Sequence, residues 1–212
     1  CGEMLTSHQK FEDRVVIVTG ASRGIGEAIS HAFALESANV AICGRDEKEL
    51  RRVSEEIGAG VFLSQCDVTS EDEVARFVNE VRGHFGKVDV LINNAGDTSS
   101  SLLEEMDLDI WNRVVSVNLT GVFLMTQKVI PLMKSQQYGR IVNIASMAGK
   151  RGSRYLSAYS AAKHGVLGFT QSVALEVVDF GVMVNAVCPG YVDTPGQKSN
   201  VEKIMKDRGL SE

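Results

Sequence analysis

Val15-Val16-Ile17-Val18-Thr19-Gly20-Ala21-Ser22-Arg23-Gly24-Ile25-Gly26 is the stretch that decides the fold. Its first four residues are β-branched, which is typical of a buried strand, and a helical pattern begins near Glu27. The glycines between them permit a tight turn and bring backbone N–H groups close to an anion at the helix N-terminus. Their spacing, G-x-x-x-G-x-G, differs from the common dinucleotide fingerprint G-x-G-x-x-G. The stretch predicts a phosphate-binding turn, with a turn that binds no ligand as the alternative.

Short β-branched runs alternate with longer amphipathic stretches along the rest of the chain. Strands are predicted at residues 15–18, 40–42, 61–63, 88–92, 141–144 and 182–187. Parallel strands need helical crossovers, and right-handed crossovers on both faces give a doubly wound, Rossmann-type parallel sheet. No repeat or proline-rich linker interrupts the pattern. We therefore expect one α/β domain at residues 11–212, preceded by a flexible arm at residues 1–10.

The composition narrows the class of partner. The 212 residues are 44% hydrophobic and carry a net charge of -5 at pH 7, without a Lys/Arg cluster, so neither nucleic acid nor an anionic membrane is expected as a partner. We recognise no apolar run of membrane-spanning length and no secretion signal. The four cysteines form no C-x-x-C pair, and the four histidines show no metal-ligand spacing. These features predict reduced thiols, a cytoplasmic protein and no metal site.

Two arginines lie where the adenosine half of a dinucleotide is expected, beyond the first two strands. The second strand ends at Gly44-Arg45-Asp46, so no carboxylate occupies the strand tip, where it would repel a 2'-phosphate. Arg23 and Arg45 are placed to bind that phosphate together, which favours NADP(H), with NAD(H) possible. In the alternatives, Asp46 binds the ribose of NAD(H), or Arg45 and Asp46 form a solvated helix start.

Tyr159 and Lys163 lie four residues apart in a predicted helix at residues 157–180, so they share one helix face. A neighbouring ammonium lowers the pKa of a phenol, which suits Tyr159 to general acid–base catalysis of carbonyl reduction or alcohol oxidation. Ser146 follows the fifth predicted strand, where its hydroxyl is placed to bind a substrate oxygen. A surface tyrosine and lysine and a turn-capping serine are the plain alternatives.

Together these motifs resemble the short-chain dehydrogenase/reductase family from about Phe11 to Pro195. In family order they are the glycine turn, Asn93-Asn94-Ala95-Gly96, Asn118 in Val117-Asn118-Leu119-Thr120-Gly121, Ser146, Tyr159, Lys163, and Pro189-Gly190 followed by Thr194. The resemblance implies a one-domain enzyme that transfers a hydride between a nicotinamide dinucleotide and a small-molecule carbonyl or alcohol. Within the family, the motifs are most similar to those of 3-oxoacyl thioester reductases and polyketide ketoreductases.

The resemblance also implies residue roles. Tyr159 would transfer the proton, Ser146 would hold the substrate oxygen, and Lys163 would bind the nicotinamide ribose and tune Tyr159. Asn118 would position a water of the proton relay, or would simply bend or cap a long helix. The implied cofactor-binding set is Gly20, Ser22, Arg23, Gly24, Ile25, Gly26, Arg45, Asp67, Val68, Asn94, Ala95, Gly96, Tyr159, Lys163, Pro189, Gly190, Val192 and Thr194.

Some assignments in this set have structural alternatives. Asp67 would contact the adenine, while Ser70 and Glu73 are predicted to form a capping box for the next helix. Asn93 would line the cofactor near its ribose, or Asn93 and Asn94 together would fix the turn. The further residues placed to face a substrate are Met147, Arg151, Arg154 and Tyr191, each of which packing or solvent exposure explains equally well.

The resemblance ends early, because relatives usually continue after Thr194 to a final strand that this sequence does not show. We therefore expect a sheet without its last strand. The helices near residues 107–133 and 157–180 would be the surface of a homodimer or homotetramer. The predicted activity is NADP(H)-dependent reduction of a ketone or 3-oxoacyl thioester. The alternatives are an NAD(H)-dependent alcohol dehydrogenase and a non-catalytic nucleotide-binding regulator on the same fold.

Overall fold

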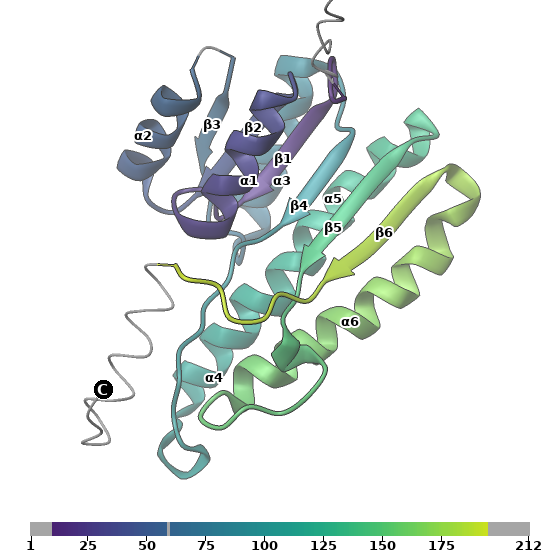
Figure 1. Ribbon diagram of the computed structural model, residues 1–212. Coiled ribbons are helices and arrows are strands. Elements are labelled where there is room, and N and C mark those ends of the chain that lie inside the picture. The colour runs from purple at the N-terminus through teal and green to yellow at the C-terminus, as the bar shows by residue number, and fades with distance from the viewer. Residues whose placement is uncertain (1–9, 59, 195–212) are drawn as a thin grey trace, which may run out of the picture.

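The computed structural model describes residues 10–58 and 60–194, and six parallel strands lie at its centre (Figure 1). They are β1 (Val15–Thr19), β2 (Asn39–Gly44), β3 (Phe62–Gln65), β4 (Val90–Asn93), β5 (Gly139–Ile144) and β6 (Val182–Val187). Every predicted strand is present within two residues of its expected ends. The spatial order is β3-β2-β1-β4-β5-β6, so the order reverses between β1 and β4. The predicted doubly wound sheet is confirmed.

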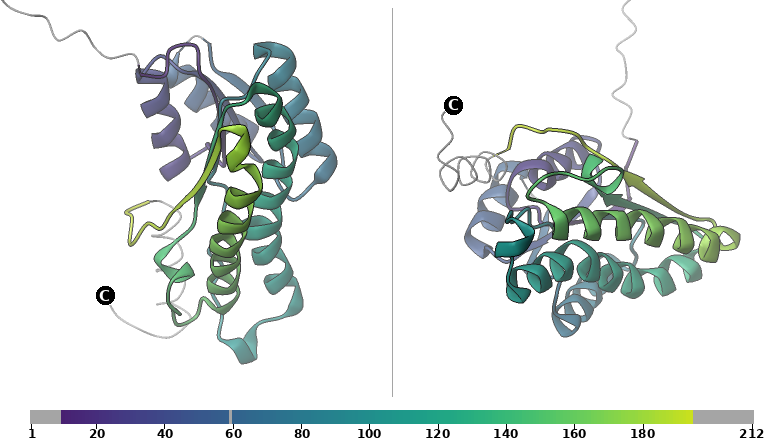
Figure 2. Two further views of the ribbon diagram at one scale, coloured as in Figure 1. Left: turned by 90° about the vertical axis from the view of Figure 1, so that its right-hand side faces the viewer. Right: turned by 90° about the horizontal axis from the view of Figure 1, so that it is seen from below.

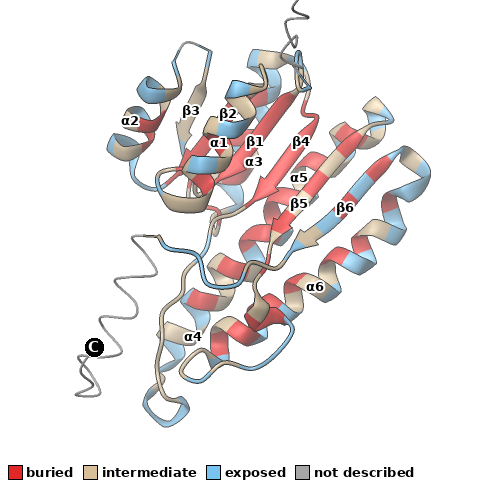
Figure 3. Ribbon diagram, viewed as in Figure 1, coloured by how far each residue is buried: buried red, intermediate tan, exposed pale blue. Residues whose placement is uncertain are grey.

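Helices cover both faces of this sheet (Figure 2). Side chains of α1 (Gly24–Leu35) and α2 (Glu47–Ile57) pack with one set of strand residues. Those of α3 (Glu71–Phe85), α5 (Gly121–Gln136) and α6 (Ser157–Val177) pack with the set that faces the opposite way. The central strands β1 and β4 are buried along their whole length, whereas β6 is partly exposed (Figure 3). The core therefore runs through the middle strands and fixes their shared carboxyl edge.

Two helices begin at acidic caps, and a third begins at a serine. Asp46 accepts a hydrogen bond from the Glu49 amide at 3.1 Å to start α2, and Asp107 does the same for α4 (Leu108–Val115). Ser70 caps α3, as predicted, by accepting from the Glu73 amide at 3.4 Å. The predicted second half of that capping box is wrong. The Glu73 carboxylate accepts from the Asp67 amide instead, because the Ser70 amide donates to the Asp67 carbonyl.

The longest helical run joins α4 to α5 through a π-helical turn, Ser116–Thr120. The run Leu108–Gln136 contains an 18-residue window with a mean hydropathy of 1.3, so by length and composition alone it could cross a membrane. The expectation of no such run is wrong on that criterion. Buried side chains of α5, among them Met125, Val129 and Met133, pack against the sheet core. This packing accounts for the apolar composition of the run.

Two expectations concern the ends of the chain. Lys10 and Phe11 are tied to the end of α1, since the Lys10 amide donates to the carboxylate of Glu36, just after the helix, and the Phe11 ring meets Phe33 of α1 edge-on. Residues 1–9 of the predicted arm lie outside the described residues. The expected lack of a last strand falls on residues 195–212, which are outside them as well.

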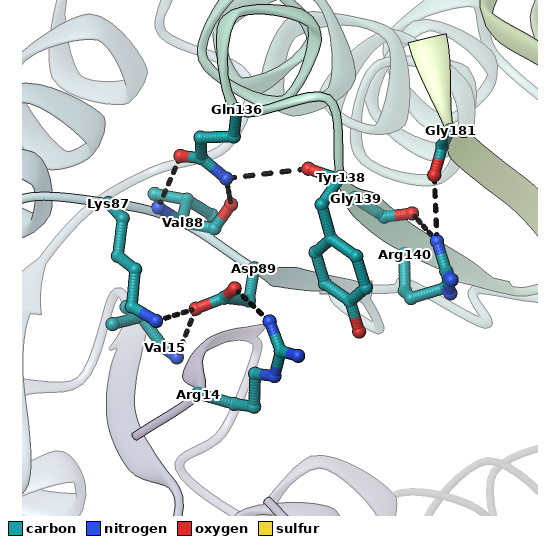
Figure 4. A network of polar contacts seen from close by, with 10 residues as sticks. All are labelled: Arg14, Val15, Lys87, Val88, Asp89, Gln136, Tyr138, Gly139, Arg140 and Gly181. Atoms are coloured by element: carbon teal, nitrogen blue, oxygen red, sulfur yellow. Dashed lines mark hydrogen bonds and ion pairs between the residues drawn. The ribbon is translucent and has the colours of Figure 1, made fainter. Parts of the chain in front are cut away.

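A buried carboxylate, Asp89, organises the amino edge of the sheet (Figure 4). It accepts from Arg14 at 2.8 Å and from the Val15 amide at 2.9 Å, and it pairs with Lys87 at 3.1 Å. Burial alone would raise the pKa of Asp89, but these donors outweigh burial and hold the pKa below its ordinary value. The carboxylate therefore joins the start of β1 to the segment that enters β4.

The same edge carries an aromatic ring between two cations (Figure 4). The guanidinium carbons of Arg14 and Arg140 lie 4.3 Å and 4.4 Å from the centre of the Tyr138 ring. Arg140 also donates to the carbonyl of Gly181, next to β6. These contacts extend the Asp89 cluster across β1, β4, β5 and β6, and place it at the edge opposite to the carboxyl ends of the strands.

We predict that Asp89→Asn destabilises the fold by about 2 kcal/mol at neutral pH, because two cations and one amide lose a charged acceptor. Since the folded-state pKa of Asp89 is lowered, its contribution is present above the unfolded pKa and is lost as pH falls through the folded pKa. Urea unfolding between pH 7 and pH 3 measures the difference between the two proteins. The exposed Asp179→Asn variant serves as control, and an Asp89→Asn effect that does not shrink with acid would contradict the ion-pair explanation.

Candidate active site

A cleft of about 940 Å³ opens along the carboxyl edge of the sheet. The turn after β1, the tip of β2, the loops after β3, β4, β5 and β6, and the start of α6 line it. All carboxyl ends of a parallel sheet lie at one edge, so residues distant in sequence meet there. Every residue of the predicted catalytic and cofactor-binding sets lines this cleft except Gly26, whereas Asn93 and Arg154, which were also predicted to face a ligand, do not line it.

The glycine turn is shaped by close approach as well as by backbone conformation. Gly20 has a φ of +65°, and a Cβ at this position would lie 2.7 Å from the Cα of Ala95. Gly26 has a different role from the predicted one, since its added Cβ would lie 2.5 Å from the Asn94 side-chain nitrogen and would also clash with the Gly20 carbonyl. Gly26 therefore allows α1 to pack against the turn and does not itself face the cleft.

The neighbouring asparagines after β4 have separate roles. The Asn94 side chain donates to the carbonyls of Thr19 and Gly20 at 2.9 Å and 3.1 Å, so it fixes the glycine turn. Asn93 is buried, and its side chain donates to Asn143 at 2.8 Å and to Thr126 at 3.0 Å. The prediction that Asn93 lines the cofactor is wrong, because its side chain points away from the cleft into a buried polar network.

Sequence reasoning missed this buried network, although it supports the whole site. Asn93 and Asn143 are partners in the register of β4 and β5, and Asn143 donates to Thr170 of α6 at 2.8 Å. The Thr170 hydroxyl in turn donates to the Val166 carbonyl. The network thus ties two strands to α5 and α6 directly beneath the cleft. The available signal was the pair of asparagines at the ends of two apolar strands, where an unpaired amide is costly.

At the end of the cleft beyond β1 and β2, Arg23 and Arg45 are both exposed and both line the cleft. Asp46 also lines it, but one of its carboxylate oxygens is engaged in capping α2. This geometry favours the helix-start explanation of Asp46 over ribose binding. Asp67 accepts from the Thr69 amide and hydroxyl at 2.9 Å and 2.8 Å, which orients its carboxylate at the same end.

Arg52 of α2 stabilises this end of the cleft without lining the cleft itself. Its guanidinium donates to Glu27 at 2.9 Å, to Glu49 at 2.8 Å and to Glu56 at 2.8 Å, and these hydrogen bonds raise its pKa. A fourth bond reaches the Ser22 carbonyl at 3.4 Å. Glu27 and Glu56 also form, with His31, a group with metal-ligand spacing. Because Arg52 already pairs with both carboxylates, we do not assign a metal to that group.

Cys66 also lies at this end, and Cys43 is buried beneath it. A hydrogen bond with Cys66, together with burial, raises the pKa of the Cys43 thiol. Both are free thiols, as is Cys188, which agrees with the prediction for the cysteines that the structure describes.

Asn118 is fully buried within the π-helical turn between α4 and α5. Its side-chain nitrogen donates to the carbonyls of Asp97 and Val114 at 2.7 Å and 2.8 Å, and its oxygen accepts from the Asp97 amide at 3.3 Å. The bond to Val114 satisfies a carbonyl within the helix next to the π-helical turn. The geometry therefore supports the structural explanation of Asn118, which also clamps the loop after β4 at the cleft.

Ser146 and Tyr159 converge at the carboxyl end of β5. The Ser146 oxygen accepts from the Ala148 amide at 3.1 Å, so it also caps the short 3-10 helix Met147–Gly149. Burial raises the pKa of Tyr159, and its hydrogen bond with Ser146 lowers the pKa by less. The predicted lowering of this pKa is wrong for the described structure, because desolvation of the phenolate outweighs the stabilising groups around it.

Lys163 lies 5.6 Å from the centre of the Tyr159 ring and is almost completely buried. Its ammonium donates to the Ile144 carbonyl at 2.7 Å. Burial lowers the pKa of Lys163 from 10.5 to about 8, although Cys188 opposes this shift. The helix thus brings the two predicted side chains to one face, as expected from their spacing.

A family model described as short chain dehydrogenase matches residues 14–204. This chain belongs to the short-chain dehydrogenase family. It is 44% identical over 189 residues to a putative ketoacyl reductase of Streptomyces coelicolor, covering 87% of this chain and 72% of that protein. It is 39% identical over 204 residues to a D-beta-hydroxybutyrate dehydrogenase of Rhizobium meliloti, covering 94% and 79%.

Solved structures show the same relationship. A crystal structure of an actinorhodin polyketide ketoreductase variant with NADPH superposes with a TM-score of 0.90 at 41% identity, covering 96% of this chain and 79% of that one. Levodione reductase superposes with a TM-score of 0.90 at 34% identity, covering 93% and 79%.

The cleft of this short-chain dehydrogenase fits a dinucleotide. Gly20 and Gly24 hold the turn at positive φ values of +65° and +62° at the N-terminus of α1, where backbone N–H groups favour phosphate. Lys163 has three N–H donors, and in the described part of the chain one of them has a hydrogen-bond partner, the Ile144 carbonyl. The remaining donors suit ribose hydroxyls, which are neutral acceptors that a buried amine can reach from the cleft.

We predict that Lys163→Met changes how stability depends on pH. Folded Lys163 has a pKa of about 8 against 10.5 for the free side chain, so the unfolded chain holds the proton more tightly. Wild-type stability should therefore rise relative to Lys163→Met between these two pH values, by at most about 3 kcal/mol. Urea unfolding from pH 7 to pH 10.5 measures this difference. Lys150→Met, at an exposed lysine, is the matched control, and a flat difference for Lys163→Met would exclude the burial effect.

Proposed function

We propose that this chain is an NADP(H)-dependent reductase of a ketone or 3-oxoacyl thioester, with Tyr159 as the proton donor. The observation that carries the proposal is the distribution of groups along one cleft. Ser146, Tyr159 and Lys163 converge beyond β5, and Arg23 and Arg45 lie beyond β1 and β2. Three strand spacings, about 14 Å, separate β2 from β5, a span that suits an extended dinucleotide.

The protein groups around the reacting carbonyl have complementary tasks. The bound dinucleotide supplies the hydride. The Ser146 oxygen accepts from Ala148, and its O–H, which bonds with Tyr159 in this structure, would turn to donate to the substrate oxygen. Since burial raises the pKa of Tyr159, its phenol stays protonated at neutral pH and donates the proton as charge develops on that oxygen. The Lys163 ammonium then stabilises the phenolate that remains.

The relatives support the choice of substrate class. The Streptomyces coelicolor protein is named a ketoacyl reductase, and the Rhizobium meliloti protein is named a dehydrogenase of β-hydroxybutyrate. Reduction of the ketone in a ketoacyl group gives a hydroxyl group like that of a β-hydroxy acid, so the two names describe opposite directions of the same type of redox reaction. The second name favours the oxidative direction, which one alternative, an NAD(H)-dependent dehydrogenase, would follow with the same side chains.

The cofactor preference separates these two functions. We predict that NADPH binds at least about tenfold more tightly than NADH, and that Arg45→Asp abolishes the difference, because the charge-assisted hydrogen bond to the 2'-phosphate is lost. Nicotinamide fluorescence titration measures both affinities. Arg51→Asp makes the same charge change on α2 outside the cleft and should preserve the preference. If the wild type binds NADH as tightly as NADPH, or more tightly, the NADP(H) assignment is wrong and the dehydrogenase is favoured.

Catalysis is tested at the proton donor. We predict that Tyr159→Phe lowers kcat for ketone reduction at least about 100-fold, since no acid replaces the phenol, while NADPH binding remains measurable by nicotinamide fluorescence. Tyr138→Phe removes a phenol at the opposite edge of the sheet and serves as control. Absence of turnover in the wild type with tight NADPH binding would instead support the non-catalytic regulator.

A further inference from the structure

The segment between Ser146 and Tyr159 is unusually basic for an acidic chain. Residues 150–156 read Lys-Arg-Gly-Ser-Arg-Tyr-Leu, with three cations and no carboxylate, whereas the whole chain has a net charge of -5. The segment is fixed at both ends. The Arg151 amide donates to the Met147 carbonyl at 3.2 Å, and the Tyr155 carbonyl accepts from Ser101, in the loop after β4, at 2.9 Å. The segment is therefore held next to the Ser146 and Tyr159 side of the cleft.

Arg151 is the cation of this segment that lines the cleft. Its side chain is exposed, and within residues 10–58 and 60–194 no carboxylate forms an ion pair with it. Arg154, which the sequence also placed near the substrate, does not line the cleft, and its guanidinium lies 5.0 Å from the centre of the Tyr155 ring.

Another arginine near the cleft, Arg113, has a guanidinium that is already paired within the protein. Arg113 of α4 donates to Asp97 at 3.0 Å and to Ser99 at 3.1 Å. Burial would raise the pKa of Asp97, but hydrogen bonds from Ser99 and the charge of Arg113 outweigh it and lower that pKa. The Arg113 charge is therefore paired within the protein, whereas Arg151 lines the cleft with no carboxylate partner among the described residues.

The strand order separates Arg151 from the arginines assigned to the cofactor. Arg45 follows β2, and Arg151 follows β5, three strands away in the sheet. A 2'-phosphate held by Arg23 and Arg45 is therefore out of reach of Arg151. The glycine turn at the N-terminus of α1 accounts for the other phosphates of the cofactor. A further guanidinium in the same cleft, next to the reacting groups, therefore calls for an anion on the substrate.

We propose that Arg151 binds an anionic oxygen group on the tail of the substrate, so that the enzyme selects 3-oxo substrates that carry a carboxylate or a phosphate. This inference rests on the proposed reductase function. The carboxylate of a free 3-oxo acid and the phosphates of a coenzyme A thioester present the same chemistry to a guanidinium. Neutral ketones of the same shape satisfy the catalytic groups but leave Arg151 without a partner.

The test uses two matched pairs of substrates with NADPH: acetoacetate against methyl acetoacetate, and acetoacetyl-coenzyme A against the acetoacetyl thioester of N-acetylcysteamine. The wild type should prefer the anionic member of at least one pair, and Arg151→Ala should lower kcat/KM for that member about tenfold, mainly through KM. The neutral member should change less than about twofold, which shows that the variant is folded and active. The pair that responds distinguishes carboxylate from phosphate recognition.

Arg154→Ala is the matched control, because it removes the same charge three residues away but outside the cleft. An equal loss in Arg154→Ala and Arg151→Ala would overturn the proposal in favour of a diffuse charge effect. Equal use of anionic and neutral substrates, unaffected by Arg151→Ala, would overturn it while leaving the reductase function intact. Failure of the wild type to reduce any of the four would overturn the proposed function, and this inference with it.

Discussion

The close approach of the glycine turn to the loop after β4 is the constraint on which the site depends. Gly20 leaves no space for a side chain against Ala95, and Asn94 bonds to the carbonyls of Thr19 and Gly20. The Thr19 hydroxyl accepts from the amides of Asn94 and Ala95, both at 3.0 Å. This contact lies where the strand order reverses, so it places the start of α1 and the loop after β4 on the two sides of one cleft.

The reacting groups depend on a second layer beneath them. Asn93, Asn143 and Thr170 form a chain of buried hydrogen bonds from β4 to α6, and the Ile144 carbonyl receives the Lys163 ammonium. Because an unpaired amide or ammonium in this position would be costly, the bonds fix the position of α6 relative to β5. Tyr159 on α6 and Ser146 just after β5 are then held facing each other.

Charge is arranged differently at the two edges of the sheet. At the amino edge, Asp89 is paired with Arg14 and Lys87 and lies away from the cleft. At the carboxyl edge, Arg23, Arg45 and Arg151 line the cleft, and none of them forms an ion pair within the described part of the chain. Arginine therefore stabilises the fold at one edge and is available to bind anions at the other. The difference is whether a buried carboxylate is close enough to pair with it.

The sequence by itself determined the sheet and most residues of the cleft, because strand and helix periodicity, glycine position and the Tyr159–Lys163 spacing are local properties of the chain. It did not determine where individual side chains point or what surrounds them. Asn93 turned into the core, Gly26 served helix packing and Glu73 bonded to Asp67, because each depends on which neighbour arrives from another part of the chain. The raised pKa of Tyr159 belongs to the same class, since desolvation is set by everything packed around the phenol, and only the tertiary structure supplies that.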